Sequence, residues 1–534
     1  MFVTQDALAA RRAAAGSYWP DATLLDHLAR AVATTPDRTA VVANRSETGE
    51  VRRISYRELD ALASAAAGGL AARGVGAGDV VSFQLPNWWE FTVLHLACLK
   101  LGAVSNPLMV IFRERELAFM LGLAATKVLV VPASFRGFDY PAMVAGIRDR
   151  LPKLAHVLVA GGTGEAAFDR LLEGPAAPPS APLSPDAVIQ LLYTSGTTGE
   201  PKGVMHTSNT MLSNLGPFAE RLGLDGRAVI HMPSPMAHQL GFMYGLVLPV
   251  MLGATAVLQD VFVAAEMARQ ITEEHATFTM GATPFLNDLT EHVAASGQAT
   301  PSLRIFVSAG APIPRALVTK ARATLGAAII SAWGMSENGA VTTTRPEDPE
   351  EKTTNTDGLA LPGMEVRVLD AHGRPAAAGM EGSLQVRGCS NFVGYLRRPE
   401  LDPKDPGGWF DTGDLARMDE AGYIRIAGRS KDIIIRGGEN IPVVEVEGLL
   451  FRHPAVAAVA IVGYPDERLG ERACAFVVLR EGHGLSFAEM TAYLADQKMA
   501  RQYIPERLEI VADLPRTPSG KIQKFKLRET ARGA

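Results

Sequence analysis

Residues 193–204, Tyr-Thr-Ser-Gly-Thr-Thr-Gly-Glu-Pro-Lys-Gly-Val, decide the fold, because they place glycines, hydroxyl groups and one lysine between two apolar segments. Glycines let backbone N–H groups come close to an anion, hydroxyl groups add donors, and Lys202 adds a mobile positive charge. The segment 188–193 predicts a buried strand, and 207–209 (Thr-Ser-Asn) predicts a helix N-cap. The sequence therefore predicts a strand, a loop that holds phosphates, and a helix.

This loop differs from the Walker A loop of P-loop NTPases. Counting G-x4-G-K-[ST] from Gly196 meets Pro201 where the second glycine should be and Gly203 where Ser or Thr should be. The spacing therefore excludes a P-loop NTPase. A flexible surface linker is the other interpretation, and twelve residues of this composition disfavour it.

The loop resembles the phosphate loop of the adenylate-forming superfamily, which includes acyl-CoA synthetases, luciferases and amino-acid adenylation domains. Four later blocks resemble further motifs of that superfamily in the same order, namely its aromatic–Gly–x–Thr–Glu block, its ribose-binding block, its hinge and its catalytic-lysine block. These blocks are 331–337 (Ser-Ala-Trp-Gly-Met-Ser-Glu), 409–415 (Trp-Phe-Asp-Thr-Gly-Asp-Leu), 428–432 (Gly-Arg-Ser-Lys-Asp) and 515–521 (Pro-Arg-Thr-Pro-Ser-Gly-Lys). The resemblance covers nearly the whole chain.

Composition is typical of a globular protein with several domains. The chain has 534 residues, 47% hydrophobic and 20% charged, with a net charge of −5, which gives no sign of nucleic-acid binding. Cys98, Cys389 and Cys474 are far apart and match no metal spacing, so we expect buried thiols in a cytoplasmic protein without disulfides. Residues 228–259 lack charge, but prolines, histidines and glycines interrupt them, which argues against a transmembrane segment.

The order of expected elements indicates the fold class. A helix-rich segment 24–70 precedes a strand at 80–85, a helix near 90–101 and a strand at 127–131, and such alternation favours α/β layers with parallel sheets. Short strands past 360 predict a small β-barrel. We therefore expect an α/β protein with a large N-terminal domain (1–428) of layered α/β subdomains plus this barrel. A small mobile α+β C-terminal domain (429–534) would carry the catalytic lysine.

The resemblance implies a two-step activation of a carboxylic acid that uses ATP, Mg²⁺ and CoA. The acid first attacks ATP to give an acyl-adenylate and pyrophosphate, and the CoA thiol then displaces AMP. The first step needs charge neutralisation more than proton transfer, which suits hydroxyls and lysines. The nucleotide-binding residues that the resemblance implies are Thr194, Ser195, Gly196, Thr197, Thr198, Gly199, Lys202, Gly310, Ala311, Pro312, Trp333, Gly334, Met335, Ser336, Asp414 and Arg429.

Particular roles follow from the same resemblance. Lys521, Thr194 and Glu337 would be catalytic, with Lys521 reaching the carboxylate and the α-phosphate, and with Glu337 and Thr194 binding Mg²⁺. Asp414 would accept hydrogen bonds from the ribose hydroxyls, with Arg429 helping. Trp333 and Ser336 depart from the commoner Tyr and Thr of the superfamily, although an aromatic ring and a hydroxyl survive.

The second step implies a movement of the C-terminal domain. In the superfamily this domain rotates about a hinge residue, here Lys431, and Gly437 and Gly438 would then line the tunnel for the CoA thiol. Acylation of Lys521 would remove a charge that adenylation needs, so a lysine acyltransferase and a deacylase are candidate partners.

The acyl pocket would include His238, Gly281, Ala309 and Gly334. The segments around these residues, 232–243, 280–286, 307–312 and 331–336, contain no Asp, Glu, Lys or Arg. A second carboxylate or an ammonium group buried there would lack a counter-charge, so the acid is expected to be apolar. Gly334 stands where acetate-specific relatives carry tryptophan, which predicts a pocket longer than two carbons.

Three further segments resemble a bacterial branch of the superfamily that contains cyclohexanecarboxylate-CoA ligase and short- and medium-chain fatty acyl-CoA synthetases. They are 85–91, 112–117 and 280–285. The predicted activity is thus an ATP-dependent carboxylate-CoA ligase acting on a medium-length or alicyclic acid such as cyclohexanecarboxylate.

Rival functions stay open at this point. An enzyme that loads an acyl or aryl group onto a separate carrier protein would share every motif, and a luciferase-like oxygenase would use the same adenylate with O₂. A nucleotide-binding protein without activity would be expected to have lost Lys521, Glu337 or Asp414, and all three are present. The sequence also leaves a homo-oligomer open.

Overall fold

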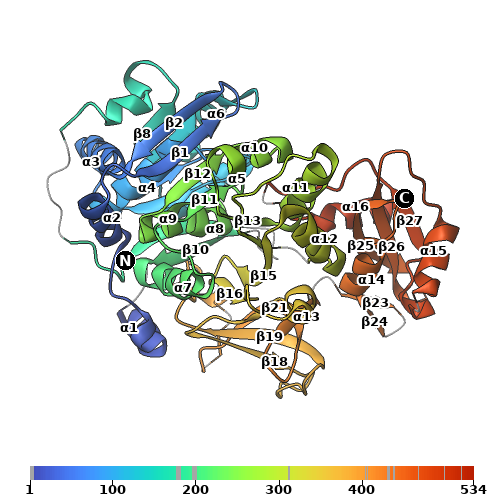
Figure 1. Cartoon of the computed structure of the whole chain (residues 1–534). Coiled ribbons are helices and arrows are strands. Elements are labelled where there is room, and N and C mark those ends of the chain that lie inside the picture. Colours follow the sequence, from blue (N-terminus) through green and yellow to red (C-terminus); the bar gives the residue numbers. More distant parts are fainter. Residues whose placement is uncertain are drawn as a thin grey trace.

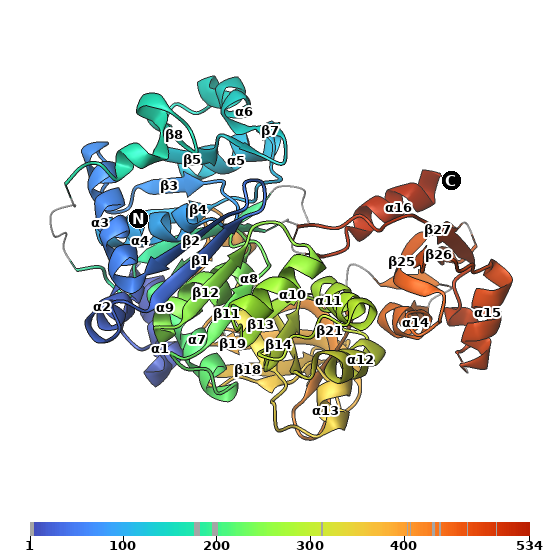
Figure 2. The ribbon, with the colours of Figure 1, turned by 45° about the horizontal axis from the view of Figure 1, so that its top comes forward.

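The computed structural model describes residues 5–175, 182–194, 201–310, 313–402, 404–405, 407–429, 433–436, 439–466, 468–497, 499–518 and 520–533, and the statements below concern these residues. The described chain forms a large N-terminal part and a smaller C-terminal unit. Figures 1 and 2 show this unit in orange to red beside α11 (Thr283–Ser296) and α12 (Arg315–Leu325). The predicted fold class, a large layered α/β part followed by a small α+β unit, is confirmed.

The larger sheet is mostly parallel. Its strand order is β17 (Leu359–Ala360), β16 (Gly339–Thr343), β15 (Ala328–Met335), β14 (Ile305–Ala309), β13 (Phe278–Ala282), β11 (Val229–Met232), β12 (Thr255–Gln259), β1 (Thr39–Arg45) and β2 (Glu50–Ser55). Strands β15 to β1 run parallel, while β2, β16 and β17 add antiparallel edges. The connections α10 (Ala264–Glu273), α11 and α12 bring the carboxyl ends of β13, β14 and β15 to one edge.

A second sheet holds the strand before the phosphate loop. Its order is β20 (Gly394–Tyr395), β10 (Lys202–Thr207), β9 (Val188–Thr194), β4 (Val104–Pro107), β3 (Val80–Phe83), β5 (Val128–Pro132) and β8 (His156–Ala160). The strands predicted at 80–85, 127–131 and 188–193 are confirmed as β3, β5 and β9. Helix α4 (Trp89–Leu101), also predicted, is buried on nearly all sides because it contacts β4 of this sheet and β1 of the larger one.

The prediction that a helix directly follows the phosphate loop is wrong. The chain first forms β10, which pairs antiparallel with β9 so that Lys202 lies opposite Thr194. Residues 203–207 are buried and β10 pairs with β20 on its other side, so tertiary pairing favours the strand. Helix α7 (Ser208–Arg221) comes next, and its predicted N-cap is confirmed because the Thr207 side chain accepts a hydrogen bond from Thr210 N.

The segment 24–70, predicted to be rich in helix, also contains a β-hairpin. Helices α2 (Leu24–Thr34) and α3 (Tyr56–Ala72) flank β1 and β2, and β1 extends the larger sheet beside β12. Burial explains the difference, because residues 40–44 are buried in succession, as in a strand covered on both faces.

The uncharged stretch 228–259 forms β11, α8 (Gln239–Phe242), a π-helical turn (Met243–Val247), α9 (Leu248–Leu252) and β12. Gly253 ends α9 with a φ of 69°, a left-handed conformation that suits glycine. In the described part of the chain, no helix is long and apolar enough to cross a membrane. The prediction of a buried helix, a glycine stop and a core strand is confirmed.

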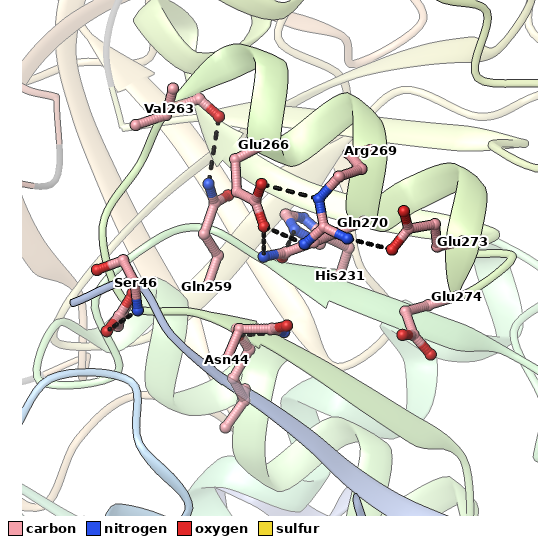
Figure 3. Close-up of polar contacts among 12 residues, drawn as sticks. Asn44, Ser46, His231, Gln259, Val263, Glu266, Arg269, Gln270, Glu273 and Glu274 are labelled. Carbon is pink, nitrogen blue, oxygen red and sulfur yellow. Dashed lines mark hydrogen bonds and ion pairs between the residues drawn. The ribbon is translucent and has the colours of Figure 1, made fainter. Parts of the chain in front are cut away.

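Helix α10 is joined to β11 by a polar network at the larger sheet (Figure 3). His231 Nε2 lies 3.0 Å from Gln270 Oε1, and Gln270 Nε2 donates to Glu266 Oε1 at 2.7 Å. Arg269 pairs with both Glu266 and Glu273. Burial lowers the pKa of His231 to about 4, so the imidazole is neutral at pH 7. The network thus joins α10 to β11.

A small antiparallel sheet follows, and then the C-terminal unit. The small sheet has the order β18 (Met364–Leu369), β19 (Glu381–Gly388), β21 (Phe410–Met418) and β22 (Ile424–Arg429). Among the described strands β22 does not pair with β18, so the predicted small barrel appears as an open sheet. The C-terminal unit comprises β23 (Ile434–Arg436), β24 (Glu439–Ile441), α14 (Val443–Leu450), β25 (Val456–Asp466), β26 (Gly470–Leu479), α15 (Phe487–Asp496), β27 (Arg507–Ile510) and α16 (Lys524–Gly533).

The remaining elements lie at the periphery or cover the second sheet. They are α1 (Gln5–Ala15), α5 (Glu114–Ala124), β6 (Ser134–Phe135), β7 (Phe138–Asp139), α6 (Tyr140–Ile147) and α13 (Glu350–Asn355). Cys98, Cys389 and Cys474 all lie within the described residues and are buried free thiols, as predicted.

Candidate active site

Strands β13, β14 and β15 carry predicted pocket residues at the carboxyl edge of the larger sheet. The parallel register places Gly281 beside Ser308, Ala309 beside Ala282, and Ser308 beside Ser331. Three of the four segments predicted to line the acyl pocket, those on β13, β14 and β15, are therefore neighbours, although they lie apart in the sequence. Ligands of parallel α/β sheets bind at this edge, because the loops that follow the strands converge there.

Asp414 on β21 is held by two donors. Trp333 Nε1, near the end of β15, donates to Asp414 Oδ2 at 2.9 Å, and Arg429 Nε donates to Asp414 Oδ1 at 2.8 Å. Asp414 and Arg429 are also cross-strand partners in β21 and β22. The structure thus brings together three of the predicted nucleotide-binding residues.

Glu337 is a buried carboxylate next to the strand that carries Lys202. Tyr395 Oη donates to Glu337 Oε1 at 2.7 Å, and Lys202 Nζ lies 5.0 Å from the centroid of the Tyr395 ring. Burial raises the pKa of Glu337, while the Tyr395 hydrogen bond and the charges of Lys202 and Arg429 oppose that rise. Tyr395 is a site residue that the sequence did not reveal, because long-range contacts bring it to Glu337. Strand β20 pairs with β10, and Phe392 N donates to the Glu337 carbonyl oxygen at 2.6 Å.

His206 on β10 is a second residue that sequence reasoning missed. Its Nε2 lies 2.8 Å from the carbonyl oxygen of Ser336, and its Nδ1 lies 3.1 Å from Thr210 Oγ1. Since a carbonyl can only accept, Nε2 carries the proton. Burial lowers the pKa of His206 to about 4, so this neutral ring fixes the backbone of the 331–337 block against β10.

Lys521 enters the site from the C-terminal unit. It follows Gly520, whose φ is 83°, and a Cβ added to Gly520 would lie 3.1 Å from Ala282 Cβ. Burial lowers the pKa of His238 to about 4, and the positive charge of Lys521 adds to this effect. The predicted catalytic lysine and the predicted pocket histidine are therefore close enough to interact.

The C-terminal unit contacts the N-terminal part around α11. Arg480 Nη1 pairs with Glu291 Oε1 at 3.0 Å, and Lys320 Nζ pairs with the same oxygen at 2.7 Å. The side chain of Phe451, just after α14, packs against apolar clusters of both parts. These contacts accompany the arrangement in which Lys521 lies near His238.

Gly334 has a packing reason to be glycine. A Cβ added there would lie 1.8 Å from the carbonyl oxygen of Gly339, because the backbones of β15 and β16 approach closely. The glycine is thus explained by the hairpin whatever the length of the acyl group. At Gly281 an added Cβ would instead meet the Phe285 side chain, at 3.0 Å.

Several predicted residues lie outside the described residues, and their placement stays a prediction. They are Ser195, Gly196, Thr197, Thr198, Gly199, Ala311, Pro312, Lys431, Gly437 and Gly438. Thr194, at the end of β9, and Gly310, just after β14, flank two of these stretches.

Within the described residues there is no group of three or more His, Cys, Asp or Glu side chains that could hold a metal ion. Glu337 is a single buried carboxylate near Lys202. Mg²⁺ usually takes one or two carboxylates and shares the phosphate oxygens of a nucleotide, so this donor set fits a magnesium–nucleotide complex.

The site thus combines an acidic side chain held by two donors, a buried carboxylate next to β10 and a lysine of the C-terminal unit close to His238. The chain matches the family described as AMP-binding enzyme over residues 28–396 and the AMP-binding enzyme C-terminal domain over residues 445–521, and it belongs to this family. Its family and relatives identify the chain as an AMP-forming ligase that joins an acid to a thiol.

Its relatives include ligases for aliphatic and aromatic acids. The chain is 37% identical over 519 residues to the medium-chain fatty-acid–CoA ligase of Escherichia coli (strain K12), covering 96% of this chain and 91% of the relative. It is 35% identical over 549 residues to a salicylyl-CoA synthase / salicylate adenylyltransferase of Streptomyces sp, covering 100% and 98%. The crystal structure of the anthranilate CoA ligase AuaEII with anthranoyl-AMP superposes with a TM-score of 0.88 at 27% identity, covering 96% and 98%.

Proposed function

We propose that this AMP-forming ligase activates a medium-length or alicyclic apolar acid, such as cyclohexanecarboxylate, and transfers it to CoA. The observation that carries the proposal is the register of β13, β14 and β15, which brings three uncharged segments together at one edge of the larger sheet. A second charged group, on the acyl chain, would find no counter-charge in these segments, because Lys521 serves the reacting carboxylate in this proposal. The Escherichia coli relative, whose name specifies medium-chain fatty acids, supports the aliphatic assignment.

In this proposal the nucleotide is held by residues from several strands. Asp414 and Arg429 bind the ribose, Thr194 and Lys202 bind the phosphates, and Glu337 with Thr194 would hold Mg²⁺. When bound, the ion neutralises phosphate charge. Tyr395 keeps the Glu337 carboxylate oriented by donating to Oε1.

Lys521 supplies positive charge for the first half-reaction. Its proximity to His238 supports a contact with the acid carboxylate and the α-phosphate, where charge develops. His238 stays neutral at pH 7 and so does not compete for the carboxylate. Gly520 and Lys521 lie close to Ala282 and His238. The C-terminal domain (429–534) would therefore turn away from the N-terminal domain (1–428) about Lys431 before the thiol arrives past Gly437 and Gly438.

The C-terminal unit has its own apolar core, which supports its movement as a separate domain. Its clusters are formed by buried residues between Ile434 and Ala531, and partly buried neighbours such as Phe451 make the contact with the larger part. Acylation of Lys521 would cancel its charge and stop adenylation, which keeps a lysine acyltransferase and a deacylase as proposed partners.

Loading of a separate carrier protein is the second candidate. It is favoured by a relative from Mycobacterium tuberculosis (strain ATCC 25618 / H37Rv), 34% identical over 520 residues, whose name is salicyl-AMP ligase / salicyl-S-ArCP synthetase. Both candidates share the adenylate and differ only in the thiol.

The test is formation of AMP and acyl-CoA from ATP, Mg²⁺ and CoA across acids from acetate to dodecanoate, with cyclohexanecarboxylate and benzoate. The full-length chain and Lys521→Ala are compared. Thioester formation that peaks on mid-sized or alicyclic acids and collapses in Lys521→Ala supports the proposal. A peak on benzoate overturns the substrate class, and adenylate without thioester supports the carrier-protein candidate.

A further inference from the structure

The indole of Trp333 does more than present an aromatic face. Its Nε1–H donates to Asp414 Oδ2 while Arg429 Nε occupies Oδ1, so each carboxylate oxygen has a protein donor before any nucleotide binds. Trp333 is 8% exposed and Asp414 is 5% exposed, which shields the indole–carboxylate bond from water. A hydrogen bond to a charged group is stronger than a neutral one, and it is strongest where water is excluded.

Both ends of this bond belong to regular structure. Trp333 pairs with Thr342 across the β15–β16 hairpin, and Asp414 pairs with Arg429 across β21 and β22. With one donor on each oxygen, the carboxylate cannot rotate without breaking a bond. A carboxylate oxygen has two lone pairs, so each oxygen can still accept one hydroxyl hydrogen in a fixed direction.

We propose that Trp333 is a positioning residue for nucleotide selection, which orients Asp414 so that the enzyme discriminates a ribose from a deoxyribose. This inference rests on the proposed ribose-binding role of Asp414. Phenylalanine at position 333 would keep an aromatic ring but lose the N–H, so Asp414 would be held by Arg429 alone. The Arg429 side chain is 32% exposed, so its bond is screened by water more than that of the indole.

A purely structural role makes a different prediction. If the bond only joined β15 to β21, its loss would lower stability and slow the reaction with every nucleotide by the same factor. If it orients Asp414, its loss mainly affects nucleotides that carry both hydroxyls. The ratio of kcat/KM for ATP to that for a deoxy analogue separates the two roles, since uniform effects cancel in the ratio.

The experiment measures pyrophosphate release by the full-length enzyme with ATP, 2′-deoxy-ATP and 3′-deoxy-ATP at saturating acid. We expect the wild type to prefer ATP, and we expect Trp333→Phe to reduce that preference by about tenfold, the effect of one hydrogen bond to a charged group. Trp88→Phe is the matched control, because Trp88 Nε1 donates at 3.1 Å to a different carboxylate, Asp260 Oδ2, that is not among the predicted nucleotide-binding residues. Its preference should equal that of the wild type.

Two further variants separate the possible failures. Asp414→Asn should bring the preference close to one, and an unchanged preference in this variant would refute the ribose-binding role itself. If Asp414→Asn loses the preference and Trp333→Phe keeps it, only the Trp333 inference is overturned. Should Trp333→Phe fail to fold, Trp333→His is tested in its place. Histidine keeps a ring N–H, so this variant is expected to retain more than half of the preference for ATP. A folded Trp333→His protein that has lost the preference for ATP overturns the inference.

Discussion

Replacing Gly334 with alanine tests why this position is glycine. The added Cβ would lie 1.8 Å from the Gly339 carbonyl oxygen and 2.9 Å from Ala340 Cα, which are backbone atoms of the facing strand. Ordinary contacts of this kind are about 3.5 Å, so the β15–β16 hairpin would have to open by about 1.7 Å. Overpacking of this kind costs about 1–3 kcal/mol of folding stability.

The opening would also displace the residues next to position 334. Trp333 precedes it and Glu337 closes the same turn, so both the ribose contact and the carboxylate proposed for Mg²⁺ would move. A misplacement of about 1 Å at a reacting centre lowers a rate by about 100-fold. We expect Gly334→Ala to lower kcat/KM by about this factor for every acid, without changing the order of preference among them.

The assay combines thermal unfolding with pyrophosphate release across the acid panel. The matched control for stability is Gly281→Ala, whose Cβ would lie 3.0 Å from Phe285 Cδ2, a side-chain atom, and should cost less stability than Gly334→Ala. A Gly334→Ala protein that unfolds at the wild-type temperature and merely shifts its preference toward shorter acids would refute this reasoning. It would show that position 334 faces the acyl chain, as the resemblance to acetate-specific relatives predicts.

Three other outcomes are expected. Tyr395→Phe removes the donor to Glu337 and should raise the Mg²⁺ concentration for half-maximal pyrophosphate release about tenfold; an unchanged Mg²⁺ titration would contradict this. Arg480→Ala breaks the partly exposed ion pair with Glu291 and should slow adenylation about two- to fivefold in single turnover. Thioester formation from added acyl-adenylate should not slow. Equal slowing of both steps would count against a role of this pair in adenylation. The pKa of His231 is about 4 in the folded protein and about 6.5 in the unfolded chain, so the folded protein holds this ring neutral. The resulting stabilisation is fully present above pH 6.5. Acidification from pH 7 to 5 lowers the free energy of unfolding by about 2 kcal/mol, because the unfolded chain then takes up a proton that the folded protein does not. The unfolding temperature of His231→Gln should therefore fall less between these pH values, and equal falls would argue against this linkage.

The sequence correctly predicted the elements that depend on residues close to one another along the chain. The apolar run before the phosphate loop, the Thr207 cap and the glycine stop at Gly253 all appeared as expected, because capping and core burial act over short stretches. Strand β10 did not appear in the prediction, since it is stabilised by β9 and β20 and not by its own pattern. Pairing between distant segments overrides local preference there.

The candidate site likewise combines residues that the motifs predicted with partners that the structure revealed. The motifs gave Asp414 and Glu337 as single residues, and the structure supplied their partners Trp333 and Tyr395 as hydrogen-bond donors. Trp333 was known from its motif, but its bond to Asp414 joins strands 81 positions apart. No spacing rule in one sequence reveals such a bond, because it depends on how the small sheet docks against the larger one.

The burial of the cysteines has a practical consequence for measuring this enzyme. Cys98, Cys389 and Cys474 are each no more than 1% exposed, and burial raises the pKa of all three thiols. A thiolate reacts with a chromogenic disulfide, and a buried protonated thiol does not. In a continuous colorimetric assay that counts free CoA, the folded protein should therefore contribute almost no background, and a slow rise in background colour would report unfolding of the enzyme during the measurement.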